Sequence, residues 1–218
     1  INYSYDYSDN MTRAEQSVED GNPLVNQKHV NMSYDFRNIL TSVTSYMEEG
    51  GQQDTYQTSY TYHDSGELAT RTTAAGTSTF SYDKAGRLTT LNDTDISGGD
   101  YTFTWDSDFR LTSMSLPNSD SHIDYTYYGE GLVKSQKAFS STEEQASYEY
   151  QYDDRGKRSE MKVDISSLDW TDHTYSYGYD SMGRLTDFTP HVGMGESISY
   201  KYDEAGNLMK KTVGVADY

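Results

Sequence analysis

Apolar and polar residues alternate with a period of two over much of the chain. Six segments carry three aromatic or aliphatic residues of one parity, separated mostly by Ser, Thr or charged residues. Alternation of this kind indicates a β-strand with one buried face and one solvated face. No segment shows a helical period with capping residues, so the sequence predicts an all-β fold. The six triplets are Val30/Met32/Tyr34, Tyr101/Phe103/Trp105, Ile123/Tyr125/Tyr127, Tyr148/Tyr150/Tyr152, Tyr175/Tyr177/Tyr179 and Ile198/Tyr200/Tyr202.

Each triplet ends at the first residue of a turn motif, aromatic-Asp-x-x-Gly-x-Leu, which repeats along the chain. The motif is complete at 82–88, 179–185 and 202–208. Its first residues, here called anchors, are 20 to 29 residues apart, which is typical of an array of small structural units. We therefore expect one array over 1–218, with weaker repeats in 1–60. The anchors of the partial copies are Tyr5, Tyr34, Tyr62, Trp105, Tyr127 and Tyr152.

The motif also predicts how each turn is built. An Asp at the first position of a type I turn bonds to the backbone, and a Gly at the fourth position adopts a left-handed conformation at little cost. Together they form a three-residue hairpin loop, in which the anchor faces the motif Leu and the Asp faces the basic residue. The residues in these roles are Tyr82, Asp83, Gly86, Arg87 and Leu88, and their counterparts are Trp105, Asp106, Tyr152, Asp153, Gly156, Tyr179, Asp180, Gly183, Arg184, Leu185, Tyr202, Asp203, Gly206 and Leu208.

Two expectations concern individual turns. Phe109 stands where Gly is expected, and a bulky residue is strained in the left-handed conformation, so we expect a different turn at 106–109. Asp153 is expected to face Lys157 across its hairpin, as a pair of opposite charges.

Apolar residues also recur three positions after the motif leucine, as at Leu88 and Leu91. An offset of three breaks the alternation of a strand. Either a β-bulge restores the parity or both faces of the strand are partly covered, and the sequence leaves both open.

Tyrosine dominates the aromatic residues, and this changes the expected core. The 218 residues include 22 Tyr, 6 Phe and 2 Trp, whereas only 33% of residues are hydrophobic. A tyrosine buries a large ring but keeps a hydroxyl that needs a hydrogen-bond partner. We therefore expect an interior of tyrosine rings with polar tips.

Composition excludes several functional classes. The chain has no Cys, so it has neither a disulfide framework nor a cysteine metal site. Its formal net charge of −18 repels nucleic-acid phosphates and anionic lipids. No apolar run approaches the roughly 20 residues of a membrane span. We expect no nucleic-acid partner and no membrane insertion.

Candidate catalytic and metal-binding residues are sparse. No two histidines have the spacing of metal ligands on one element, and residues 93–100 lack the ligand spacing and terminal Glu of an EF-hand loop. Ser and His residues occur without a nucleophile-elbow motif. We expect no catalytic residue, no metal site and no cofactor, and ligand-binding residues are undetermined. The histidines are His29, His63, His122, His173 and His191.

The complete motifs at 82–88, 179–185 and 202–208 resemble the YD repeat of the Rhs family, which is similar to teneurins and to the B and C components of insecticidal toxin complexes. The resemblance extends from Tyr3 to about Val213. It implies β-hairpins side by side in one continuous curved or spiralling sheet. In that family the sheet forms a hollow shell that encloses a C-terminal toxin or effector. The implied location is secreted or at the bacterial cell surface.

The resemblance leads us to expect a structural segment of a shell, cut from a longer protein. No Asp-Pro-x-Gly segment for self-cleavage and no recognisable cargo domain are present. We therefore expect the chain to be a structural part of the shell wall rather than an enzyme. The expected partners are the remainder of the same shell and an enclosed effector. Unpaired strand edges predict edge-to-edge self-association of the fragment. The alternative function is a carbohydrate- or receptor-binding module that uses the aromatic ladders.

Overall fold

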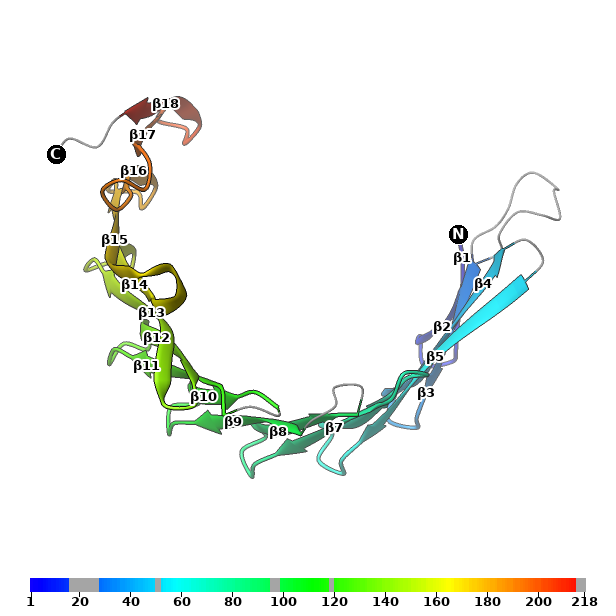
Figure 1. The fold of residues 1–218 in the computed structure, drawn as a ribbon. Coiled ribbons are helices and arrows are strands. Elements are labelled where there is room, and N and C mark those ends of the chain that lie inside the picture. Colours follow the sequence, from blue (N-terminus) through cyan, green and yellow to red (C-terminus); the bar gives the residue numbers. More distant parts are fainter. Residues whose placement is uncertain (16–27, 50–51, 95–98, 118–119, 215–218) are drawn as a thin grey trace. The chain divides into compact units, whose positions relative to one another are not determined.

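The computed structural model describes residues 1–15, 28–49, 52–94, 99–117 and 120–214. In this part of the chain, eighteen strands belong to one sheet, and strands that follow one another in sequence pair antiparallel (Figure 1). They form nine hairpins, and the only helical segment described is a 3-10 turn, η1 (Ser166–Leu168). The predicted all-β array of about nine antiparallel hairpins is confirmed.

The strands group into two compact units. The first, Ile1–Thr102, contains β1 (Asn2–Tyr5), β2 (Met11–Glu15), β3 (Lys28–Tyr34), β4 (Leu40–Glu49), β5 (Gln52–Tyr62), β6 (Leu68–Thr72), β7 (Thr77–Tyr82), β8 (Leu88–Asp93) and the start of β9 (Asp100–Trp105). The second, Phe103–Tyr218, contains the rest of β9, β10 (Leu111–Ser115), β11 (His122–Tyr127), β12 (Val133–Ser140), β13 (Glu143–Tyr152), β14 (Arg158–Ile165), β15 (Trp170–Tyr179), β16 (Leu185–Thr189), β17 (Ser197–Tyr202) and β18 (Leu208–Gly214).

Each anchor is the last residue of the first strand of a hairpin, and a short loop leads from it to the second strand. In the β7–β8 hairpin, the Asp83 amide donates to the Arg87 carbonyl at 2.9 Å, and the Gly86 amide donates to the Asp83 carbonyl at 3.0 Å. Gly86 has a φ of 75°, the left-handed conformation that glycine adopts at little cost. Tyr82 pairs with Leu88 across the hairpin. The predicted loop and register are confirmed here.

A β-bulge beside the loop explains the offset of three. Tyr82 pairs with Leu88, but Thr89 is skipped before pairing resumes opposite Ser81. Leu91 therefore lies on the same face as Leu88, and the Thr89 hydroxyl donates to the Ser81 carbonyl at 3.2 Å. Of the two explanations that the sequence left open, the bulge is correct. Equivalent register shifts occur at Tyr5, Tyr34, Tyr62, Tyr127, Tyr152, Tyr179 and Tyr202.

The expectation of a different turn at 106–109 is wrong. The Asp106 amide donates to the Arg110 carbonyl at 3.0 Å, and the Phe109 amide donates to the Asp106 carbonyl at 3.4 Å, as in the glycine-containing loops. Phe109 adopts a φ of 63°. The Asp106 carboxylate accepts the amides of Asp108 and Arg110 and so holds the loop closed against this strain. The ring of Phe109 is 61% exposed, so no packing forbids its position.

We expect Phe109→Gly to raise the free energy of unfolding by about 1 kcal/mol, because glycine has no Cβ to strain the left-handed backbone. Urea denaturation followed by circular dichroism measures the change. The matched control is Asp9→Gly, at a φ of 62°, where the change should stay within about 0.5 kcal/mol because Asp already tolerates this conformation. A Phe109→Gly variant that is less stable than the parent would contradict the strain argument.

The aromatic face of the sheet is only partly covered. Among the hydrophobic residues described, Val163 alone is buried, with 3% of its surface exposed. The aromatic residues of β7, β9 and β13 are half-buried, whereas Tyr5 and Tyr7 are exposed. The described residues therefore do not form the expected tyrosine interior. A closed core needs a second layer of secondary structure, and each unit described here is a single sheet.

Candidate functional site

The residues singled out by the motif gather in the hairpin loops, where the aspartate organises each loop. The Asp180 carboxylate accepts the amides of Met182 and Arg184 at 3.0 and 2.9 Å, and the Arg184 guanidinium at 2.6 Å. Asp83 and Asp106 accept the equivalent three bonds in their own loops. The aspartate carboxylate thus accepts loop amides that have no backbone partner, and it also binds the basic residue, as the motif predicted.

These bonds lower the pKa of the loop carboxyl groups. For Asp83, Asp106 and Asp180 the main cause is the backbone amide of the arginine four residues on, and the guanidinium of that arginine lowers the pKa further. For Asp203 the main cause is the side-chain amide of Asn207. The charged form of each carboxyl group is therefore the form that the folded loop prefers.

We expect the folded chain to lose stability in acid. The pKa of each loop carboxyl lies below the ordinary value of 3.8 in the folded chain. The charged carboxylate therefore stabilises the folded chain fully above that value, and this stabilisation is lost as the pH falls through the lower pKa of the folded chain. Thermal unfolding from neutral pH to about pH 2 at constant ionic strength measures the loss. Asp180→Asn should weaken the pH dependence, whereas Met182→Ala, an exposed residue in the same loop that carries no titratable group, should not. Equal pH profiles for the parent and Asp180→Asn would contradict this assignment.

Asp153 faces Lys157 across the hairpin as predicted, since its amide donates to the Lys157 carbonyl at 2.8 Å, but the predicted pairing of their charges is wrong. Arg155 binds the Asp153 carboxylate through Nε and Nη2 at 3.2 and 2.9 Å, while Lys157 contributes only its backbone amide. The Arg155 Nη1 also donates to the carbonyl of Asp180 in the next loop at 2.6 Å. A planar guanidinium can hold a carboxylate with two nitrogens and keep a third for the neighbouring loop, and an ammonium group cannot.

Arginines connect neighbouring loops in the same way elsewhere in the second unit. Arg184 donates to the Asp203 carbonyl at 3.1 Å, and its guanidinium lies 4.7 Å from the ring centre of Tyr202. Arg110 likewise donates to the carbonyl of Tyr128 in the next loop at 3.3 Å. The basic position of the motif therefore serves two hairpins, and the pairing within one hairpin does not reveal this.

The anchor tyrosines connect neighbouring hairpins through their hydroxyl groups. The Tyr202 hydroxyl donates to the carbonyl of Leu185, the motif leucine of the preceding hairpin, at 2.8 Å. This tyrosine–carbonyl bond explains why the anchor is Tyr rather than Phe, and sequence reasoning missed it. Its signal was the excess of 22 Tyr over 6 Phe. The other bonds of this kind join Tyr34 to Met11, Tyr62 to Leu40, Tyr127 to Leu111, Tyr152 to Val133 and Tyr179 to Arg158.

The histidines lie against other rings. His63 occupies the first position of its hairpin loop, and its ring meets Tyr82 of the next hairpin edge-on at 5.9 Å. No cluster of three or more His, Asp or Glu residues in the described ranges could hold a metal ion, and residues 95–98 of the acidic loop lie outside those ranges. The remaining stacks are His29 on Tyr46, His122 on Phe139, and His173 on both Trp170 and His191.

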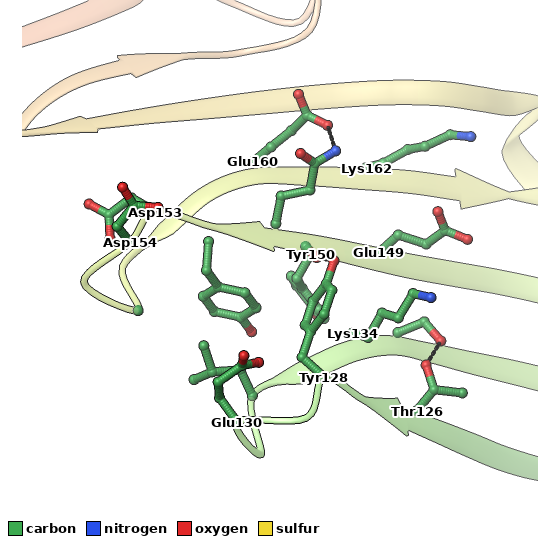
Figure 2. A pocket seen from close by; sticks show the side chains of 15 residues that line it. Thr126, Tyr128, Glu130, Lys134, Glu149, Tyr150, Asp153, Asp154, Glu160 and Lys162 are labelled. Carbon is green, nitrogen blue, oxygen red and sulfur yellow. Dashed lines mark hydrogen bonds between the residues drawn. The ribbon is translucent and has the colours of Figure 1, made fainter.

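A groove of about 1040 Å³ lies beside the loop after β11, where the motif lacks both its aspartate and its basic residue (Figure 2). Tyr128 takes the place of the loop aspartate, and Leu132 takes the place of the basic residue. The Tyr128 hydroxyl donates to the Tyr150 carbonyl at 3.0 Å, and its ring meets Tyr152 edge-on at 6.1 Å. Tyr128 therefore connects two hairpins where the usual charged pair is missing.

Most polar groups of the groove already have partners. Gln151 donates to Glu160 at 2.9 Å. This bond is the dashed line that ends on Glu160 in Figure 2. Lys162 is paired with Asp172 on β15, and this contact raises the pKa of Lys162. Lys134 lies 5.9 Å from the ring centre of Tyr128. The groove is thus a surface on which side chains join strands to one another.

Comparison with known proteins agrees with the motif. A family model described as RHS Repeat matches residues 62–95 and 82–121. The fold is similar to that in a crystal structure of TcdB2-TccC3-Cdc42, with a TM-score of 0.71 and 19% identity over 93% of this chain. Residues 62–121 of the chain match the Rhs repeat. A structure of the Photorhabdus luminescens Tc holotoxin pore is also similar, with a TM-score of 0.71 and 19% identity over 87% of the chain.

The similarity concerns a small part of those larger proteins. The chain spans 13% of the first structure and 11% of the second. A crystal structure of TcdB2-TccC3-TEV is similar with a TM-score of 0.72 and 16% identity, over 97% of this chain and 13% of the other. At these identities the likeness concerns the fold. No curated protein matches the chain in sequence, and no described helix is long and apolar enough to cross a membrane.

Proposed function

We propose that this chain is a wall segment of a larger β-shell, in a secreted or surface-bound bacterial protein whose shell encloses a toxin or effector domain. The observation that carries the proposal is the tyrosine–carbonyl bond that recurs from one hairpin to the next, as between Tyr202 and Leu185. A repeat that contacts only the repeats on either side of it can form an extended wall of any length, because adding a repeat requires no contact with distant ones.

The chemistry of the repeat supports a structural role. The motif residues close the loop, set the register and join hairpins, and each of these roles is structural. In the loop of Asp180, for example, the carboxylate is occupied by two amides and a guanidinium. The structures with the same fold include a Tc holotoxin pore, which supports a setting of toxin delivery.

Electron cryo-microscopy of the full-length protein that contains these residues tests the proposal. We expect the nine hairpins to continue into further hairpins and to line a cavity that holds the density of another domain. Protease treatment of the intact protein should leave that domain uncut until the wall is unfolded. Hairpins that form a free-standing arm, with solvent on both faces, would rule out the wall.

We also propose a second function, binding of a carbohydrate or receptor, because three aromatic rings are exposed at loop positions. Tyr7, Phe36 and Phe109 are 111%, 95% and 61% exposed. Aromatic rings of this kind stack on sugars and anchor protein interfaces. A glycan array should then show hits that disappear in the triple alanine variant. An empty array, or hits that survive the three substitutions, would remove this second candidate.

A further inference from the structure

The groove beside Tyr128 lies within the second unit and is lined by two neighbouring hairpins, β11–β12 and β13–β14 (Figure 2). Its volume of about 1040 Å³ equals that of the larger small-molecule sites in proteins, which reach about 1,000 Å³. A row of polar residues crosses the four strands here, each paired with the next: Thr126, Ser135, Glu149 and Lys162. The floor of the groove therefore belongs to the polar face of the sheet.

A tyrosine ring supplies the groove with an aromatic surface. The Tyr128 hydroxyl is held by the Tyr150 carbonyl at 3.0 Å, and the half-buried ring meets Tyr152 edge-on. Because these contacts already fix the ring, a ligand that packs on it does not have to order it first. The C–H face of a sugar ring is apolar, so it packs well on an aromatic ring of this kind.

The hydrogen-bonding groups of the groove that have no described partner suit a ligand rich in hydroxyl groups. The hydroxyls of Thr126 and Ser135 share one bond of 2.6 Å, which uses one of their two hydrogens. Within residues 120–214, no hydrogen bond or ion pair is described for the carboxylates of Glu130, Glu149 and Asp154. A sugar hydroxyl both donates and accepts, so it can use the remaining hydrogen and these carboxylates together.

The groove also has an excess of negative charge. Five carboxylates and two ammonium groups line it: Glu130, Glu149, Asp153, Asp154 and Glu160, against Lys134 and Lys162. Of the two cations, Lys162 is already paired with Asp172 on β15. A hollow lined by charges of one sign concentrates ligands of the opposite sign. The ligand should therefore carry positive charge, and a sugar with a carboxylate should be repelled.

We propose that the groove binds a short oligosaccharide that carries free amino groups. One sugar ring packs on Tyr128, and an ammonium group of the sugar binds Glu149. Sugar hydroxyls bond to the Thr126–Ser135 pair. This site is a binding activity beyond the wall, and the exposed loop rings of the second candidate function do not line it.

Isothermal titration calorimetry of the intact chain tests the groove with trisaccharides that differ in charge. They are a trimer of glucosamine, its N-acetylated form and a trimer of galacturonic acid, in mildly acidic buffer in which the amino groups are charged. The glucosamine trimer should bind, and added salt should weaken the complex. The N-acetylated trimer keeps the rings but not the charge and should bind about tenfold more weakly, and the galacturonic acid trimer should not bind.

Glu149→Gln separates the groove from the other acidic surfaces of the chain. Glu149 is exposed, so the variant should fold and should melt at the temperature of the parent. It should bind the glucosamine trimer about tenfold more weakly and the N-acetylated trimer as well as the parent does. The matched control is Glu204→Gln, an exposed residue of the loop after β17 that does not line the groove, and it should leave both affinities unchanged.

Several results would overturn the groove as an amino-sugar site. These are no binding of the glucosamine trimer, equal binding of the galacturonic acid trimer, or an unchanged affinity in Glu149→Gln. Binding that is kept in Glu149→Gln but lost in the triple alanine variant of Tyr7, Phe36 and Phe109 would also overturn it, and would leave the second candidate function standing. None of these results bears on the wall, which the map of the full-length protein tests separately.

Discussion

Deletion of Thr89 is expected to lower the free energy of unfolding by about 3 kcal/mol, because it removes the extra residue of the bulge. Without that residue, pairing outward from Tyr82 and Leu88 runs in simple alternation. Leu91 then moves from the aromatic face, where it pairs with Phe80, to the solvated face. Every later side chain of β8 changes face with it. Urea denaturation gives the loss of stability, and hydrogen exchange should show it first in β7 and β8.

The control for this deletion is Thr89→Val, which keeps the number of residues. It removes only the bond of 3.2 Å from the Thr89 hydroxyl to the Ser81 carbonyl, and such a bond contributes about 1 kcal/mol. If the deletion cost no more than the substitution, the register would not depend on the bulge, and the explanation of the three-residue offset would be wrong.

The second large effect is expected for Tyr127→Ala, which should lower the free energy of unfolding by about 2 to 3 kcal/mol. The Tyr127 ring lies 4.9 Å from the guanidinium of Arg110, and its hydroxyl donates to the Leu111 carbonyl at 2.7 Å. Burial raises the pKa of this tyrosine, as expected for a hydroxyl shielded from water. The substitution removes both the ring and the bond, so the hairpins of Trp105 and Tyr127 lose their side-chain connection at this point.

Two further variants separate the ring from the hydroxyl. Tyr127→Phe keeps the ring and should cost about 1 kcal/mol, the usual value of one hydrogen bond. Tyr7→Ala removes a fully exposed tyrosine and should change stability by no more than about 0.5 kcal/mol. Denaturation curves of the three variants provide the comparison. No loss in Tyr127→Phe would show that the tyrosine–carbonyl bond does not hold the hairpins together.

Much of each hairpin could be predicted from the sequence. Loop type, register and the position of Tyr82 opposite Leu88 depend on residues within seven consecutive positions, and their conformational preferences are strong. The alternation of aromatic and polar residues likewise placed strands such as β9 and β13 correctly. The prediction for Phe109 was wrong because a local preference of about 1 to 2 kcal/mol was outweighed by the bonds that the Asp106 carboxylate makes to the loop.

The contacts between hairpins could not be predicted in the same way. The choice of Arg155 over Lys157 as the partner of Asp153 depends on a carbonyl of the next loop, at Asp180. The predicted burial of the tyrosine rings was also wrong, because composition does not reveal whether a second layer of secondary structure covers the sheet.

The sequence by itself determined the all-β class, the nine hairpins, their loops and the pairing of each anchor with its motif residue. These features follow from interactions between residues close together in the chain. Only the tertiary structure decided that the anchor hydroxyl bonds to the preceding hairpin and that the loop arginines reach the following one. Such contacts join groups about 20 residues apart, so they depend on how whole hairpins pack side by side and not on any local preference.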